Sequence, residues 1–171
     1  MPAVMQVEGR DIPEPYRSLL VHERDMTPTL EDACRRSIQL RVLQYTFDHE
    51  VFSRQVVLLP EGGQSPVEFG ASKIYLEHLP SEARRLVLER RHPLGGILRA
   101  QGIAHAGRPG AYIQVTADDV IVSALQLEGP NLLYGRRNVI IDGRRRTLAE
   151  VVEILPPWNG TWQAEQDRGR R

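Results

Sequence analysis

Apolar and polar residues alternate in several parts of the chain, and this pattern predicts β-strands. Residues 51–59 are predicted to form a strand. Every second residue of a strand lies on the same face, so one face carries Phe52, Arg54, Val56 and Leu58. Residues 38–47 alternate in the same way, and the "DHE" that follows is a turn sequence. The two stretches predict a hairpin, with Arg54 on the more apolar face of its second strand.

Two other stretches have helical signals. "MTPTLEDACRRS", from Met26, has threonines that can cap a helix, a proline suited to the first turn and early acidic residues. "LPSEARRLVLERRHPLGGIL" has apolar residues at helical spacing up to Pro93, and a second short helix is expected through Ile97 and Leu98. We therefore expect a short early helix and a central pair of helices around an "HPLGG" elbow.

The remaining segments are predicted to be extended. They are "VEFGASKIYL", "AYIQVTADDVIVSALQL" and "NVIIDGRRRTLAEVVEILP", the last with a "DG" turn signal at 142–143. Consecutive strands joined by short turns favour an antiparallel α+β fold over regular strand–helix alternation. The 171 residues suit a single domain, with loosely held ends at residues 1–16 and 158–171.

The charge balance and the cysteine content narrow the function classes. The 22 basic and 22 acidic residues cancel, so we expect no nucleic-acid partner. The single cysteine, Cys34, excludes a disulfide within the chain. No apolar run approaches 18 residues and the start lacks a signal-peptide pattern, so we expect a cytoplasmic protein without a membrane span.

Metal and cofactor motifs are missing from the sequence. The five histidines have no metal-ligand spacing, and no nucleophile elbow or nucleotide-binding loop is found. We therefore predict neither a metal site nor a cofactor. The chemistry is left to lone charged residues in apolar strands.

Arg54 has two interpretations. A strand-end arginine commonly reaches solvent and pairs with a surface carboxylate. Alternatively, its planar guanidinium binds a ligand carboxylate inside a pocket, a geometry that lysine cannot reproduce.

The "LAEVVEILPP" strand contains two acids on opposite faces, Glu150 and Glu153. Alternation does not choose between them, because both faces are otherwise apolar. One is expected to be solvated, and the other to be a buried acid with a raised pKa, suited to proton transfer. The "HPLGG" elbow is either a simple helix break or a place where backbone N–H groups approach a bound anion.

Five motifs in order resemble the chorismate lyases (4-hydroxybenzoate synthases). They are "RDMTPTLE", "SRQVVLL", "HPLGGIL", "LLYGRRNVIIDGR" and "VVEILPP", and the resemblance covers residues 17–157. It implies a single α+β domain with an antiparallel six-stranded sheet and helical flaps over a buried ligand pocket. It also implies conversion of chorismate to 4-hydroxybenzoate and pyruvate without a cofactor, supplying an aromatic precursor.

The resemblance also implies roles for single residues. Arg54 would hold the ring carboxylate and Glu153 would face the 4-oxygen, as the catalytic pair. Met26 and Leu94 would line the site chiefly through their backbones. Where some relatives have an arginine, this chain has "GASK", so either Lys73 or no residue fills that role, and residues 97–133 would form a different second flap.

The sequence leaves two alternatives to this lyase open. One is a lyase that releases a different hydroxybenzoate. The other is a non-catalytic module that binds a small aromatic acid, because ligand-sensing domains of some bacterial repressors are thought to share this fold. Those repressors carry a DNA-binding domain ahead of the sensor, and only about sixteen residues precede the predicted domain here. On that ground the prediction favours a lyase that acts on chorismate. We also expect a monomer.

Overall fold

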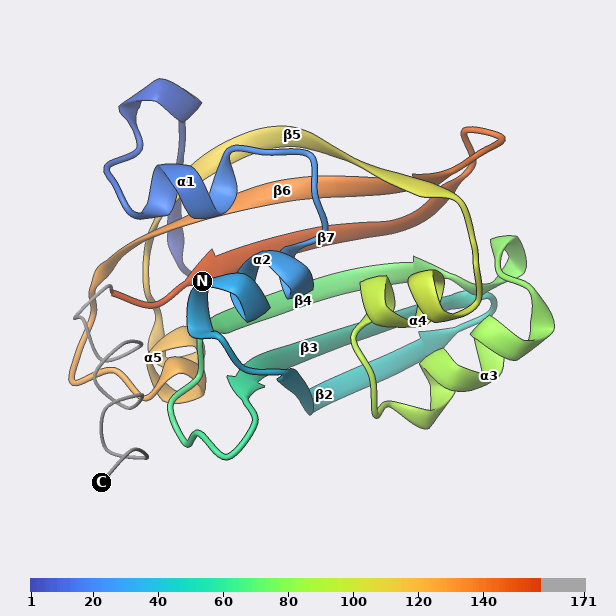
Figure 1. Ribbon diagram of the computed structural model, residues 1–171. Coiled ribbons are helices and arrows are strands. Elements are labelled where there is room, and N and C mark those ends of the chain that lie inside the picture. Colours follow the sequence, from blue (N-terminus) through green and yellow to red (C-terminus); the bar gives the residue numbers. More distant parts are fainter. Residues whose placement is uncertain (158–171) are drawn as a thin grey trace.

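The protein forms one antiparallel seven-stranded sheet with helices on both faces (Figure 1). This computed structural model describes residues 1–157. The strands lie in the order β1-β5-β6-β7-β4-β3-β2. Their bounds are β1 Ala3–Val7, β2 Ile38–Asp48, β3 Val51–Pro60, β4 Glu68–Tyr75, β5 His105–Thr116, β6 Leu132–Asp142 and β7 Thr147–Leu155.

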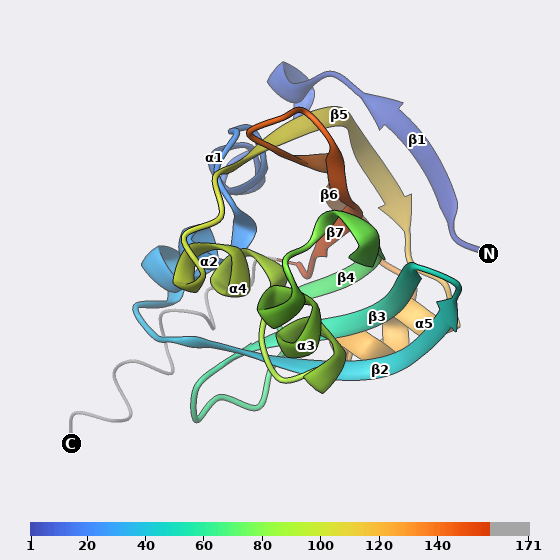
Figure 2. The ribbon, with the colours of Figure 1, turned by 90° about the vertical axis from the view of Figure 1, so that its right-hand side faces the viewer.

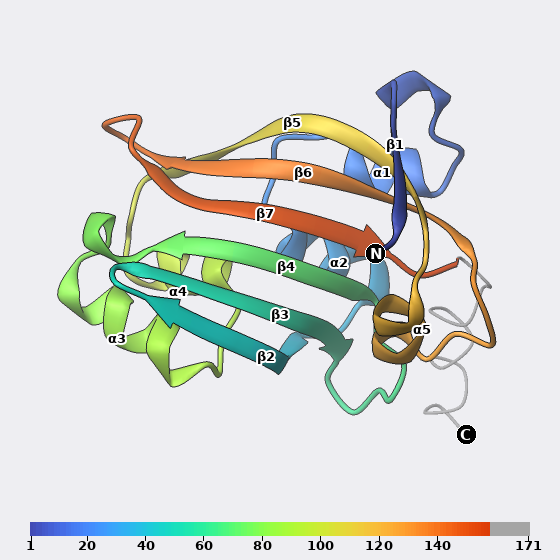
Figure 3. The ribbon, with the colours of Figure 1, turned by 180° about the vertical axis from the view of Figure 1, so that it is seen from behind.

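Most of the helices cover one face of this sheet. α1 (Tyr16–Leu20), α2 (Met26–Cys34), α3 (Ser81–Glu89) and α4 (Leu94–Ala100) lie on the side nearest the viewer in Figure 1. α5 (Asp119–Leu125) covers one end of the opposite face (Figure 3). Two short 3-10 turns, Gly9–Asp11 and Leu76–His78, complete the described helical segments.

The sheet is strongly curved, and its two edges bend away from α1–α4 (Figure 2). The face covered by α1–α4, called the helix side below, packs two apolar clusters, one around Phe52, Ile74 and Leu98 and one around Leu20, Leu30 and Leu58. The concave face packs a third cluster under α5 and is otherwise open. Because strand residues alternate between faces, every strand contributes to both sides.

The α+β fold and the predicted hairpins are confirmed. β2 and β3 are joined through the turn at His49, which has a φ of 53°, and β6 and β7 through the predicted "DG" turn. The predicted early helix is found; it begins at Met26, and Asp25 occupies its N-cap in place of the predicted threonine. The central pair of helices is also found, as α3 and α4.

Two segments differ from the predictions. Residues 3–7, expected in a loosely held end, form β1 against β5, so the sheet has seven strands and not six. Residues 119–125 lie in a segment predicted to be extended, but they form α5. There the Asp118 side chain accepts a hydrogen bond from the Ile121 N–H and caps the helix.

The predicted C-terminal tail, residues 158–171, lies outside the described residues. Within residues 1–157, no helix is long and apolar enough to cross a membrane.

Candidate functional site

A small cavity of about 70 Å³ lies between the sheet and the starts of α2 and α4. We call it the helix-side cavity. All four predicted site residues line it, from four different elements: Met26, Arg54, Leu94 and Glu153. The structure therefore brings the predicted residues together, although their roles remain predictions.

Strand register arranges the cavity floor in two rows. The first row runs across β3, β4, β7 and β6 as Arg54, Ser72, Val151 and Asn138. The second row runs across the same strands as Val56, Gly70, Glu153 and Arg136. Gly70 has no side chain to fill its position in the second row, and we call this position the bare place. A Cβ there would lie 3.1 Å from Val56 Cγ2.

Arg54 is buried, with 5% of its surface exposed. Within residues 1–157, its Nε and Nη1 have no hydrogen-bond partner. Burial lowers the pKa of the guanidinium to about 10, which leaves it charged at neutral pH. A surface arginine paired with a carboxylate is therefore the wrong interpretation, and the side chain lacks an anion.

The two acids of β7 separate as the alternation required. Glu150 is exposed on the concave face, where it accepts a hydrogen bond from the Tyr75 hydroxyl at 2.6 Å. Glu153 is buried on the helix side, with its Oε2 at 2.5 Å from Arg136 Nε. Burial raises the pKa of Glu153, and the charge of Arg136 offsets only part of that effect.

Arg136 is fully buried, and it was not among the site residues predicted from the sequence. Besides Glu153, it donates hydrogen bonds to the carbonyls of Leu20, His22 and Arg24, the last two at 2.8 and 2.9 Å. It therefore fixes the segment that leads into α2. Alternation within "YGRRNVI" places Arg136 on the same face as Asn138 and Ile140, and this was the available signal.

Glu68 is a second buried charged residue that the sequence reading missed. It is 4% exposed and lines the cavity, and within the described chain its Oε2 has no hydrogen-bond partner. Burial, reinforced by the charge of Glu153, raises the pKa of Glu68 well above its usual value, and Arg136 counteracts this only in part. Since Arg136 pairs with Glu153, burial favours the neutral form of Glu68 more strongly than that of Glu153.

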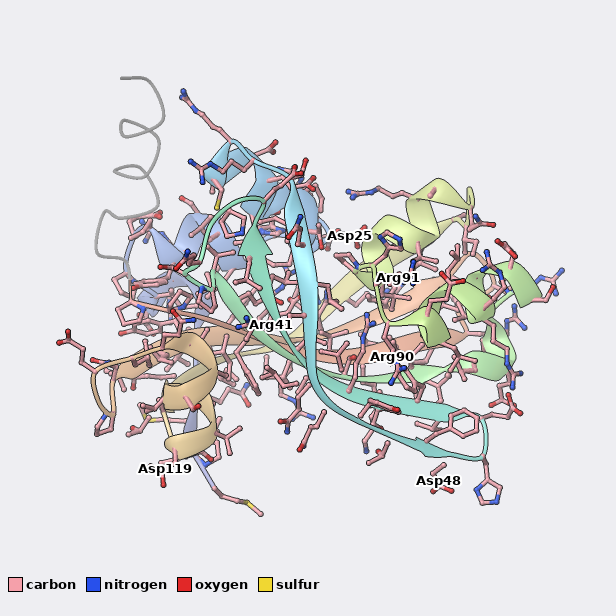
Figure 4. All side chains as sticks on the ribbon, turned by 90° about the horizontal axis from the view of Figure 1, so that it is seen from below. Asp25, Arg41, Asp48, Arg90, Arg91 and Asp119 are labelled. Atoms are coloured by element: carbon pink, nitrogen blue, oxygen red, sulfur yellow. The ribbon has the colours of Figure 1, made fainter. Side chains whose placement is uncertain are left out.

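The cover of the cavity is held at Asp25, which lies between α2 and α4 in Figure 4. Asp25 Oδ2 lies 2.8 Å from His105 Nε2 of β5, and the Asp25 side chain packs where Gly95 lacks a Cβ. Burial lowers the pKa of His105, but the Ile103 carbonyl and Asp25 outweigh this, and the net pKa is raised. This close packing of α2 on α4 keeps the cavity small.

The concave face holds a larger, open hollow of about 640 Å³, which we call the trough. Its lining includes the polar residues Gln44, Ser53, Gln55, Lys73, Arg137 and Glu150, and it shares Arg54, Ser72 and Asn138 with the helix-side cavity. Lys73 is exposed here, so its side chain belongs to the other face from Arg54. The predicted alternative in which Lys73 serves the Arg54 site is therefore not supported by the alternation.

No family model and no curated protein matches the sequence. Solved structures do match. The effector domain of PhnF from Mycobacterium smegmatis is 14% identical with a TM-score of 0.58, over 77% of this chain and 87% of that one. PhnF itself is 13% identical with a TM-score of 0.59, over 79% of this chain and 64% of that one.

Another similar structure is the ligand-binding domain of a candidate GntR-family transcriptional regulator from Bordetella bronchiseptica. It is 14% identical, with a TM-score of 0.52, over 70% of this chain and 85% of that one. YydK from Bacillus subtilis, a candidate transcriptional regulator, has a TM-score of 0.54 at 10% identity. The match covers 74% of this chain and 59% of YydK.

These findings correct the functional predictions. The similar structures are regulators or their effector and ligand-binding domains, so the predicted chorismate lyase, its lyase chemistry and its chorismate substrate are contradicted. The expectations of no nucleic-acid partner and of a monomer are contradicted with them. The α+β fold is shared with the PhnF effector domain and the Bordetella ligand-binding domain, and it places a charged cavity beside the starts of α2 and α4.

Proposed function

We propose that this chain is a small-molecule-binding regulatory module that takes an organic anion at Arg54. The observation that carries the proposal is the buried guanidinium of Arg54, which lines both the helix-side cavity and the trough and has two nitrogen atoms without a partner in the described chain. A buried charge without a partner costs several kcal/mol or more, so a bound anion would remove a large penalty. Carboxylate and phosphate groups fit the fork of a guanidinium.

The helix starts support the same choice. Met26 is the first residue of α2 and Leu94 is the first residue of α4, and both line the cavity. Backbone N–H groups in a first helical turn lack partners within the helix and favour negative charge. Arg54 supplies the full charge, and these helix starts add to the positive potential around it.

The size of the cavity implies movement. Ligand pockets usually enclose about 300–1,000 Å³, whereas this cavity encloses about 70 Å³. A ligand larger than a few water molecules must displace α2 or α4 to enter. Binding would therefore change the position of the cover, which suits a regulator better than a rigid carrier.

We infer that the module acts on a DNA-binding partner domain. Its similarity to PhnF, YydK and the Bordetella ligand-binding domain supports this role. A protein that acts on transcription must share a compartment with the DNA, so we propose a cytoplasmic location. The proposed domain extends from β1 to residue 157, beyond the predicted start at residue 17, because β1 completes the sheet.

Calorimetry with four probes tests the anion site: butyrate, benzoate, ethyl phosphate and inorganic phosphate. We expect at least one to bind the wild-type protein, and Arg54→Gln to weaken its binding by about 100-fold, as the loss of charge-assisted hydrogen bonds predicts. The matched control is Arg137→Gln, which removes an exposed guanidinium from the trough. Equal binding by Arg54→Gln and the wild type would contradict the proposal.

A further inference from the structure

Two buried carboxyl groups meet beside the bare place at Gly70. Glu153 of β7 pairs with Gly70 in the strand register. Glu68 of β4 folds over the same place, since its Oε1 lies 3.3 Å from where a Cβ of Gly70 would be. Both side chains line the helix-side cavity, so a ligand on its floor reaches both acids.

The charges at this end of the cavity do not balance. Arg136 is the guanidinium that pairs with Glu153, and its other described contacts go to the carbonyls of Leu20, His22 and Arg24 and to the His22 ring, whose Nδ1 lies 3.4 Å from Nη1. Glu68 has no cation of its own within residues 1–157, and its Oε2 has no hydrogen-bond partner. An ionised Glu68 therefore needs one positive charge that the described chain does not supply.

The other end of the cavity has the opposite deficit. Arg54 carries a buried positive charge without an anion. Ser72 pairs with Arg54 and lies four positions along β4 from Glu68, a backbone distance of roughly 13 Å at the usual strand rise. The Glu68 side chain folds over Gly70, two positions nearer to Ser72, and this shortens the gap to the Arg54 end. A compact ligand can therefore contact both.

We propose that the ligand is a zwitterion whose ammonium group binds at Glu68 and Glu153 while its anionic group binds Arg54. This inference rests on the proposed function, because it concerns the ligand of the same cavity. An ammonium group has three N–H donors, and the carboxylate oxygens of Glu68 and Glu153 can accept hydrogen bonds from them.

The alternative is that Glu68 is a structural acid that keeps its proton when the ligand binds. The two interpretations predict different ligand preferences. A neutral Glu68 has no charge to offer an amine, so an amine-free anion would bind as well as its amino counterpart. An ionised Glu68 would favour the amino compound.

Calorimetry with matched probe pairs tests this directly on the wild-type protein. The pairs are 4-aminobutyrate with butyrate, and O-phosphoethanolamine with ethyl phosphate. We expect the amino member of at least one pair to bind about tenfold tighter or more, the scale of a charge-assisted contact. The wild-type comparison needs no variant, so a folding defect in a mutant leaves the test intact.

Variants then assign the preference to the acid. Glu68→Gln should reduce the ratio within a pair to about threefold or less, because it removes the charge and keeps the shape. Glu150→Gln makes the same chemical change on the opposite face of the sheet and should leave the ratio unchanged. Arg54→Gln should weaken both members of each pair.

The outcomes separate the two proposals. If both members of each pair bind the wild type equally and Arg54→Gln weakens them, the zwitterion inference is overturned and the anion site stands. If no probe binds at millimolar concentration, both are overturned for small anions. A preference for the amine that survives Glu68→Gln would also overturn the role given to Glu68.

Discussion

The two faces of the central sheet carry similar charged residues in very different settings. On the helix side, β3, β4, β6 and β7 supply Arg54, Glu68, Arg136 and Glu153, all buried. On the trough side, β4, β6 and β7 supply Lys73, Arg137 and Glu150, all exposed. An exposed charge is solvated and contributes little, whereas a buried charge needs a partner. The comparison shows that burial, and not the number of charges, distinguishes the candidate site.

Substitutions of the two neighbouring arginines of β6 should show the largest difference in stability between the two faces. Arg136→Met leaves Glu153 buried without its cation and frees three backbone carbonyls, so we expect a loss of about 3–5 kcal/mol in the free energy of unfolding. Arg137→Met, one residue further along and exposed, should change it by less than about 0.5 kcal/mol. Urea denaturation of both variants measures the difference. Similar losses would show that the two faces do not differ as described.

A glycine on each face gives the next largest effect. Gly70→Ala places a methyl group 3.1 Å from Val56 Cγ2 and 3.3 Å from Glu68 Oε1, on the cavity floor. We expect probe binding to weaken about tenfold, or 1.4 kcal/mol, because the bare place is filled. Gly110→Ala, in the trough, meets only the Arg137 carbonyl at 4.0 Å and should leave binding unchanged. Calorimetry with the tightest probe of the panel compares the two.

The pH dependence of stability should sharpen the contrast between the acids. The pKa of Glu68 is raised well above 4.5 in the folded protein, so the folded state binds its proton more tightly than the unfolded state. The stabilising contribution of this proton on Glu68 to the free energy of unfolding is therefore fully present below about pH 4.5. It is lost as the pH rises through the folded-state pKa of Glu68.

Glu68→Gln removes this loss. We expect Glu68→Gln to increase the free energy of unfolding by about 1–3 kcal/mol more at pH 8 than at pH 4. This is the scale of a buried unsatisfied polar group. Denaturation curves of the wild type and the variant at the two pH values provide the measurement. A difference that is the same at both pH values would contradict the assignment of the proton to Glu68.

The smallest effect is expected at Glu150. Glu150→Gln keeps an acceptor for the Tyr75 hydroxyl and removes an exposed charge. We expect a change below about 0.5 kcal/mol in stability at any pH between 5 and 8. A change as large as that of Glu68→Gln would mean that the trough also holds a desolvated charge.

Alternation was enough to predict part of the site. It placed Arg54 with Phe52, Val56 and Leu58, and it separated Glu150 from Glu153 onto opposite faces. The turn signals gave the β2–β3 and β6–β7 hairpins, and the elbow at Pro93 gave the start of α4. These features depend on short stretches of sequence.

The remaining features depend on contacts between distant segments. The Arg136–Glu153 pair requires the register of β6 against β7, which a period of two does not specify. Glu68 follows a run of turn-forming residues, and its burial comes from the neighbouring strands and α2. β1 was missed because its pairing with β5, more than 100 residues away, supplies the order that the local sequence lacks. The regulatory class came from comparison of whole folds, since the motifs alone resembled an enzyme family.

The alternation of β4 also sets how this protein tolerates change during evolution. Glu68 and Gly70 line the helix-side cavity and not the trough, Lys73 lines the trough and not the cavity, and Ala71 and Ser72 line both. A point substitution at Glu68, Gly70 or Lys73 can therefore alter one hollow while the other keeps its residues. A one-residue insertion or deletion in β4 would instead exchange the two sets at once and turn the cavity residues into the trough. Relatives that bind different ligands should thus differ in β4 by substitution and keep its length.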